Sequence, residues 1–134
     1  GCSPRVIAGV MNGMAAADFL GNIQWNVMLQ LAEQGPCVIV GRKADYILKD
    51  RPDALHAFIH ADMAYRAERI VRLYGESEKS PEARLQEKDK RRRVNYQHYT
   101  GRTWGTAQNY DICLNSSKLG IETCVDILVN LASK

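Results

Sequence analysis

A short stretch about a quarter of the way along the chain is apolar without interruption. It extends from Cys37 to Val40, begins after Pro36 and ends at Gly41. An unbroken run of β-prone residues is typical of a strand buried on both faces of a parallel sheet, and a proline suits the first residue of such a strand. We therefore predict a buried strand over residues 37–41.

Apolar residues at helical spacing flank this strand. Before it, a helix is predicted from Asp18, with Gly35 as its stop signal and an apolar face of Leu20, Ile23, Val27, Met28 and Leu31. The small-residue stretch from Arg5 to Ala17 is interpreted as helical too. After the strand, residues 43–48 are expected to form a short helix and residues 49–53 a polar turn.

The second half of the chain repeats the order of strand and helix. A strand is predicted over residues 55–60, followed by a helix over residues 63–74 that the Asp62 side chain caps and Gly75 closes. Its apolar face is expected to comprise Met63, Ala67, Ile70, Val71 and Tyr74. Strand, helix and strand in this order are typical of βαβ units, which require a parallel sheet.

A third strand and a last helix complete the pattern. The strand covers residues 110–114, and a turn follows at residues 115–117. The helix extends from about Gly120 to Ala132 and presents a core face of Ile121, Val125, Leu128 and Val129. These elements predict an α/β fold in which helices flank a parallel sheet, as one domain over residues 1–134.

The helix predicted from Pro81 to about His98, capped by Ser80, differs from the others because it is polar all round. Residues 81–102 hold seven basic and three acidic residues, a net charge of +4, whereas the whole chain carries +3. Like charges at helical spacing repel, so their density hints at an anionic partner. We interpret residues 76–105 as a mobile excursion that carries these cations; a plain solvated helix face is the alternative.

Composition narrows the class of protein. The chain has 134 residues, of which 25% are charged and 46% hydrophobic, as in soluble globular domains. No apolar run approaches the roughly 20 residues of a membrane span, and no signal peptide is visible, so a cytoplasmic location is expected. The cysteines show no metal-ligand spacing with the histidines, which predicts free thiols and no metal site at Cys2, Cys37, Cys113 and Cys124.

Arg42 is the first candidate binding residue, because it stands where the predicted strand 37–41 ends. In open α/β sheets, ligands bind beyond the carboxyl ends of the strands. A guanidinium there offers a rigid fork of donors to a phosphate or a carboxylate. A surface arginine in an ordinary salt bridge is the alternative interpretation.

Several motifs, taken in their order, resemble the cytidylate-kinase-like family of P-loop nucleoside monophosphate kinases. The resemblance covers the chain from about residue 20 to its end. It implies a three-layer α/β fold with a five-stranded parallel sheet, and transfer of the γ-phosphoryl group of ATP, with Mg²⁺, to a nucleoside monophosphate. The motifs are Val38 to Arg42 with Asp45, Phe58 to Ala61, Arg66 to Arg69, Asp89 to Arg92, Tyr99 to Gly101 and Asn109 to Ser117.

The resemblance also implies roles for particular residues. Arg42 matches the arginine that holds the phosphate of the acceptor nucleotide. Asp45 is expected to contact the base, and Arg66 is assigned to substrate binding with them. Residues 76–105 correspond to the lid of such kinases, in which the expected catalytic cations are Lys88, Arg91 and Arg92.

Two features depart from the family. Lys43 stands directly after the Gly-Arg pair, where cytidylate kinases carry an acid, so the nucleobase stays open. The sequence also holds no G-x-x-x-x-G-K-[ST] motif, whose glycines and lysine cradle the phosphates of ATP. We interpret the chain as the C-terminal portion of a longer kinase, without its first strand and P-loop. We expect that this chain alone does not phosphorylate CMP or any other monophosphate with ATP.

Two other functions stay open beside the kinase. One is a non-catalytic protein that binds nucleotides or other phospholigands. The other is a small RNA-binding domain, in which the cations of residues 84–93 lie beside stacking surfaces formed by Tyr96, Tyr99 and Trp104. A nucleoside monophosphate is the expected partner, nucleic acid is less favoured, no membrane partner is expected, and a homo-oligomer is left open.

Overall fold

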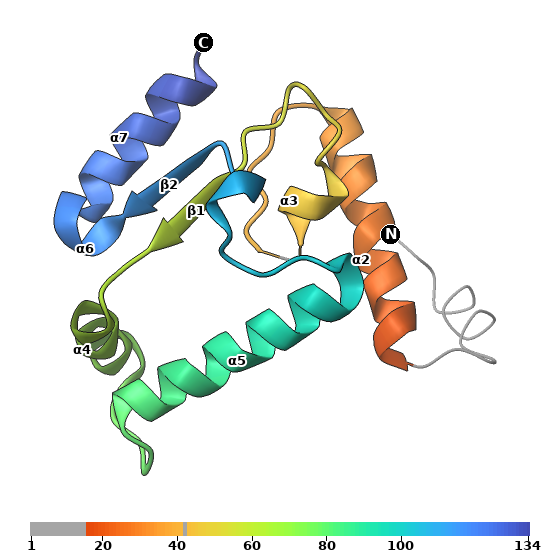
Figure 1. The fold of residues 1–134 in the computed structure, drawn as a ribbon. Coiled ribbons are helices and arrows are strands. Elements are labelled where there is room, and N and C mark those ends of the chain that lie inside the picture. The colour runs from red at the N-terminus through yellow and green to blue at the C-terminus, as the bar shows by residue number, and fades with distance from the viewer. Residues whose placement is uncertain (1–15, 42) are drawn as a thin grey trace. The chain divides into compact units, whose positions relative to one another are not determined.

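The computed structural model describes residues 16–41 and 43–134, which divide into two compact units between Ala54 and Leu55. The first unit holds helices α2 (Ala16–Gln34) and α3 (Ala44–Ile47), and the second holds the remaining described elements (Figure 1). In the described part of the chain, no helix is both long and apolar enough to cross a membrane. The prediction of one domain over residues 1–134 stays a prediction. Of the helix predicted from Arg5 to Ala17, the part up to Ala15 lies outside the described residues.

Helices α2 and α3 confirm the two helices predicted on either side of residues 37–41. Met28 of α2 packs with Ile47 and Leu48, and these three residues form the buried core of the first unit. Trp25 meets the ring of Tyr46 edge-on, with the ring centroids 5.8 Å apart. The short helix α3 is therefore held against α2 by apolar and aromatic contacts.

The buried strand predicted over residues 37–41 is wrong. These residues form no regular secondary structure, and Val38 and Val40 are 91% and 85% exposed, whereas Ile39 packs against the core of the first unit. A strand needs a neighbour with which its backbone groups pair. In the described ranges, the only pairing is between two strands of the second unit, so β-propensity alone has not made a strand here.

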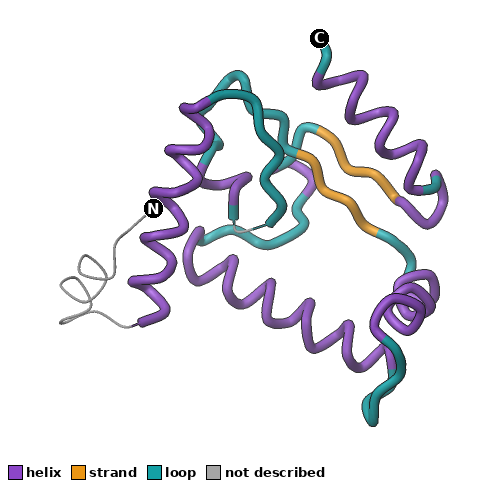
Figure 2. The backbone as a smooth tube through the Cα atoms, turned by 180° about the vertical axis from the view of Figure 1, so that it is seen from behind, coloured by secondary structure: helices purple, strands orange, loops and turns teal. Residues whose placement is uncertain are grey.

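The sheet of the second unit is parallel, as the order of elements predicts. Phe58 pairs with Cys113, and Ile59 pairs with Leu114, in strands that begin two residues later than predicted. The described architecture is therefore mixed α/β, with a two-stranded parallel sheet and flanking helices (Figure 2). In chain order the elements of this sheet and its crossover are β1 (Ala57–His60), α4 (Met63–Tyr74), α5 (Pro81–Thr100), η1 (Ala107–Asn109) and β2 (Ile112–Asn115).

Local signals define the ends of α4 and α5. Gly75 follows α4 with a φ of 78°, a positive value that glycine adopts without strain. Ser80 begins α5 by accepting a hydrogen bond from the Ala83 N–H at 3.2 Å, which confirms the predicted cap. Asp62 precedes α4 as predicted, but its side chain makes no capping hydrogen bond, so that part of the prediction is wrong.

The end of the chain differs from the prediction in two respects. In place of the turn expected at residues 115–117, Asn115 ends β2 and Ser116 begins a short helix, α6 (Ser116–Leu119). Helix α7 (Ile121–Ala132) is confirmed, but Cys124 is its buried residue, and most of its predicted core face is exposed. A two-stranded sheet covers only a narrow stripe of a helix, so these apolar residues have little to pack against: Ile121, Val125 and Val129.

An aromatic cluster joins β1 to the loop that follows α5. The ring centroid of Phe58 lies 5.0 Å from that of Tyr110, 5.5 Å from that of Trp104 and 6.3 Å from that of His60. Gly105 has a φ of 83°, and a Cβ added there would lie 3.4 Å from Phe58 Cζ. The loop therefore packs closely on the first strand of the sheet.

Candidate functional site

The basic helix α5 packs against α4 through a small apolar cluster. Leu85 of α5 lies against Ala67 and Ile70 of α4, and all three side chains are buried. Met63 and Val71 pack against the edge of this cluster, which confirms their predicted place on the apolar face of α4. The cluster brings cations of both helices into one region of the second unit.

An ion pair joins the same two helices. Arg66 Nη1 and Nη2 donate to the two carboxylate oxygens of Asp89, each at 2.8 Å. The side chains are 26% and 13% exposed, so much of the pair is shielded from water. Arg92 lies one turn further along α5, with its Nη1 3.4 Å from Asp89 Oδ1. Guanidinium groups from two helices therefore meet at one carboxylate.

This arrangement shifts the protonation equilibria of the pair. The hydrogen bonds from Arg66 lower the pKa of Asp89 below its ordinary value, although burial opposes the shift. The same hydrogen bonds raise the pKa of Arg66, again against burial. Both groups therefore stay charged throughout the neutral range.

Asp89 should make the stability of the second unit depend on pH in the acid range. Its pKa is lower in the folded chain than in the unfolded one. The stability it contributes is therefore fully present above the ordinary pKa of about 3.9, and it is lost as the pH falls through the lower folded value. We expect Asp89→Asn to have a lower urea midpoint than the unchanged chain at neutral pH. Its midpoint should also fall less than that of the unchanged chain when the pH is lowered from about 6 to about 3.

Urea unfolding followed by circular dichroism at both pH values measures this dependence. The control is Glu76→Gln, which removes an exposed carboxylate from the link between α4 and α5. If acid lowered the urea midpoint of Asp89→Asn as much as that of the unchanged chain, other carboxylates would cause the acid sensitivity.

The cations predicted to be catalytic lie on α5 in different surroundings. Lys88 Nζ is 5.8 Å from the ring centroid of Tyr74, which is within cation–π range. Arg91 is exposed, whereas Arg92 shares the carboxylate of Asp89. The structure therefore brings Lys88 and Arg92 to α4. Tyr74 was predicted on the buried face, but it is 74% exposed because it stands in the last turn of α4, beyond the apolar cluster.

Two further contacts fix the start of α5. Arg84 Nη1 donates to the carbonyl oxygen of Gly75 at 2.8 Å, so this cation closes the end of α4 instead of facing solvent. Lys79 Nζ lies 2.7 Å from Glu87 Oε2. The hydrogen bond from Lys79 is the main cause of the lowered pKa of Glu87, and the charge of Arg91 adds a smaller effect. The more exposed cations of α5 therefore lie in the middle of the helix, from Lys90 to Arg93.

Two of the residues predicted to bind substrate belong to the first unit. Arg42 lies outside the described residues. Asp45 is partly buried in the first turn of α3. The neighbours of Arg42 on both sides, Gly41 and Lys43, have positive φ values of 69° and 60°. Both neighbours therefore adopt the left-handed backbone conformation.

The carboxyl edge of the sheet is occupied by its own hydrogen bonds. Ser117 Oγ accepts from the Asp62 N–H at 3.0 Å, and its N–H donates to Asn115 Oδ1 at 3.0 Å. Ser116 Oγ donates to the carbonyl oxygen of His60 at 3.3 Å. These polar side chains tie the ends of the two strands to α4 and α6, which is a structural role.

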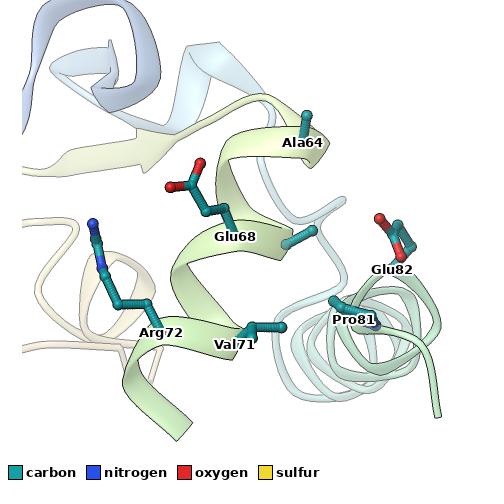
Figure 3. A pocket seen from close by; sticks show the side chains of 7 residues that line it. Ala64, Glu68, Val71, Arg72, Pro81 and Glu82 are labelled. Carbon is teal, nitrogen blue, oxygen red and sulfur yellow. The ribbon is translucent and has the colours of Figure 1, made fainter. Parts of the chain in front are cut away.

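An open groove of about 610 Å³ lies between α4 and the start of α5 (Figure 3). Val71 and Pro81 point toward each other across it, whereas the side chains of Glu68 and Arg72 extend away from α5. None of the residues predicted to bind substrate or to act in catalysis lines this groove, so it is not the candidate site. Its lining comprises Ala64, Ala67, Glu68, Val71, Arg72, Pro81 and Glu82.

The sequence analysis missed the face that α5 turns toward its neighbours. Leu85 and Tyr96 are buried and Asp89 is nearly so, and these positions follow one another at helical spacing. An acid in the middle of the stripe concealed it, because Asp89 counts as polar in any hydrophobic pattern. An acid at a core position of α5, together with an arginine on the preceding helix, is the sequence signal that could have indicated this face.

Comparisons with known proteins agree with the resemblance. The family model of the cytidylate kinase-like family matches residues 3–118. Among solved structures, the chain is similar to an uncharacterised protein from Eubacterium ventriosum, with a TM-score of 0.80 and 30% identity, and the match covers 90% of this chain and 68% of that chain. No curated protein matches the chain. Because the family model covers most of its length, the chain belongs to the cytidylate kinase-like family.

Proposed function

We propose that this chain carries the acceptor site and the lid of a nucleoside monophosphate kinase, which transfers the γ-phosphoryl group of ATP to a nucleoside monophosphate. Membership of the cytidylate kinase-like family supports a kinase-like role. The proposal includes the three-layer P-loop fold of such kinases, and the parallel direction of the two described strands supports it.

The observation that carries the proposal is the meeting of Arg66 and Arg92 at one carboxylate, with Lys88 on the same helix as Arg92. Phosphoryl transfer requires little covalent chemistry from a protein. It requires that the reacting groups are positioned and that positive charge surrounds the phosphoryl oxygens. Guanidinium groups supply that charge in a form that pairs with oxyanions through two parallel hydrogen bonds.

The proposed roles follow from this requirement. Lys88, Arg91 and Arg92 neutralise the phosphoryl group that is transferred, and closure of α5 and its flanking links excludes water from it. Arg42 holds the phosphate of the acceptor, Asp45 contacts its base, and Arg66 is assigned to substrate binding.

Magnesium accompanies ATP in reactions of this kind. The described side chains include no group of three or more His, Cys, Asp or Glu residues that could hold a metal ion.

Binding of nucleoside monophosphates tests the acceptor site. We expect Arg42→Ala to weaken binding of the preferred monophosphate by about 1.5–3 kcal/mol, the value of a hydrogen bond to a charged group. Isothermal titration with CMP, UMP, AMP and GMP measures both the base preference and this loss.

Arg51→Ala is the matched control for Arg42→Ala. It removes the same charge from the first unit, but the guanidinium of Arg51 is already paired with Glu33 and Asp53, each at 2.9 Å. We expect it to leave the affinity nearly unchanged. Equal affinities of Arg42→Ala and the unchanged chain would exclude Arg42 as the phosphate ligand.

RNA binding is less well supported as a second candidate. It would need aromatic rings that are exposed for stacking beside the cations. Tyr96 is buried, and Trp104 packs edge-on against Phe58 with the centroids 5.5 Å apart. A steep loss of affinity with salt, over a site of several nucleotides, would favour RNA nevertheless.

A further inference from the structure

We infer that Asp89 is a positioning residue, which fixes the cation-bearing part of α5 against α4 so that Lys88 and Arg92 are presented to a phosphoryl group. This inference rests on the proposed function. It concerns the acid of the basic helix, to which that function gives no role. Asp89 touches no reacting atom in this scheme and acts through Arg66.

The position of Asp89 along α5 supports this role. Leu85 anchors α5 one turn earlier, and the six residues from Lys90 to Asn95 that follow Asp89 are all exposed. The bond to Arg66 therefore holds α5 to α4 immediately before the exposed stretch that carries most of the cations. A bond through two parallel N–H···O contacts fixes orientation as well as distance. Without this bond, α5 would be held to α4 by the Leu85 cluster, the Arg84–Gly75 hydrogen bond and the Lys88–Tyr74 contact, all of which involve α5 residues before Asp89.

The two arginines contact Asp89 unequally, and the difference matters for the mechanism. Arg66 donates to both carboxylate oxygens at 2.8 Å, whereas Arg92 approaches one of them at 3.4 Å, and its side chain is 56% exposed. Exposed ion pairs of that kind are weak. Arg92 can therefore turn from Asp89 to a phosphate while Asp89 stays bound to Arg66.

A competing interpretation predicts the opposite change in phosphate affinity when the Asp89 carboxylate is removed. If Asp89 merely occupied the place of a phosphate between two arginines, its removal would release both guanidiniums and strengthen phosphate binding. If Asp89 positions α5, its removal weakens phosphate binding although the chain gains one unit of positive charge. Pyrophosphate is the probe that separates the two, because it engages cations without any requirement for a nucleobase.

The experiment compares pyrophosphate affinity by isothermal titration in the 134-residue chain and its variants, under conditions where circular dichroism shows them folded. We expect Asp89→Asn to weaken binding about tenfold, the change that corresponds to a modest loss of orientation. Asp89→Glu keeps the charge and should recover part of the affinity. Asp126→Asn is the control, since it makes the same change of charge at an exposed site on α7.

Amide exchange supplies the second readout. In Asp89→Asn, residues 86–93 should exchange faster, while residues 121–132 of α7 should not change. Should Asp89→Asn fail to fold, Arg66→Lys takes its place, because it keeps the positive charge and removes the bidentate geometry. The same loss of pyrophosphate affinity is expected from it.

The outcomes are distinct. Tighter or equal binding in Asp89→Asn, or no pyrophosphate binding by the unchanged chain, overturns the positioning role. Weaker binding in Asp89→Asn, with Asp126→Asn unaffected, supports it. A different measurement, the titration with nucleoside monophosphates, tests the proposed function. That function fails if the chain does not bind them or if Arg42→Ala leaves the affinity unchanged.

Discussion

Leu85→Ala is expected to lower the free energy of unfolding of the second unit by about 2–4 kcal/mol. The side chain is 7% exposed and is the residue that α5 contributes to the buried cluster with Ala67 and Ile70. Truncation removes its apolar contacts and leaves a cavity, because the backbones of two helices held by caps and an ion pair cannot close around the gap. Urea unfolding with far-UV circular dichroism measures the loss.

Val94→Ala is the matched control on the same helix. The Val94 side chain is 61% exposed, and its truncation should change the free energy of unfolding by less than about 0.5 kcal/mol. If the two variants lost equal stability, α5 would not be anchored to α4 by Leu85, and the geometry of the Arg66–Asp89 pair would have to be maintained by other contacts.

Much of the fold could be predicted because its signals are local. Helix α5 begins where Ser80 and Pro81 indicate, and α4 ends at the glycine that permits a positive φ. The parallel direction of β1 and β2 followed from the order of elements, since a crossover that contains helices joins parallel strands. These features depend on a few adjacent residues or on connectivity, both of which a sequence displays.

The features that could not be predicted depend on distant neighbours. Residues 37–41 have the composition of a buried strand, but a strand exists only with a pairing partner, and composition does not say whether one is present. The same reason explains α7, where Val125 and Val129 have the spacing of a core face and are exposed. An apolar stripe tells which face of a helix would be buried, not whether anything covers it.

The candidate site was predictable in its chemistry and less so in its pairing. The density of basic residues on α5 indicated that this helix binds an anion. Lys88 lies near Tyr74 of α4, and Arg92 contacts the carboxylate that Arg66 of α4 also binds. The partner of Arg66 was not foreseen, because Arg66 and Asp89 are 23 residues apart and belong to different helices. Only the packing of α4 on α5 brings them together. The assignment of Arg66 to substrate binding stays a prediction, and in this structure Arg66 Nη1 and Nη2 bind Asp89.

Phe58 is the residue of β1 on which the loop between α5 and β2 packs. Its ring contacts those of Trp104 and Tyr110, and a Cβ added to Gly105 would lie 3.4 Å from Phe58 Cζ. Aromatic pairs with such geometries contribute about 0.5–1.5 kcal/mol each beyond the burial of their area. A loop that holds two of the partners should therefore depend on this one ring.

Phe58→Ala is accordingly expected to lower the free energy of unfolding by about 2–4 kcal/mol, through the loss of ring contacts together with the cavity that remains. Phe58→Leu is the matched control, because it keeps most of the apolar volume and should lose about half as much. In a Trp25→Phe background, Trp104 is the one remaining tryptophan, and its emission should shift to longer wavelength in Phe58→Ala as the indole becomes hydrated. Amide exchange over residues 101–111 should accelerate in the same variant. An unchanged emission spectrum and unchanged exchange would mean that contacts other than the aromatic cluster hold the loop, because the prediction attributes the shielding of Trp104 from water to the Phe58 ring.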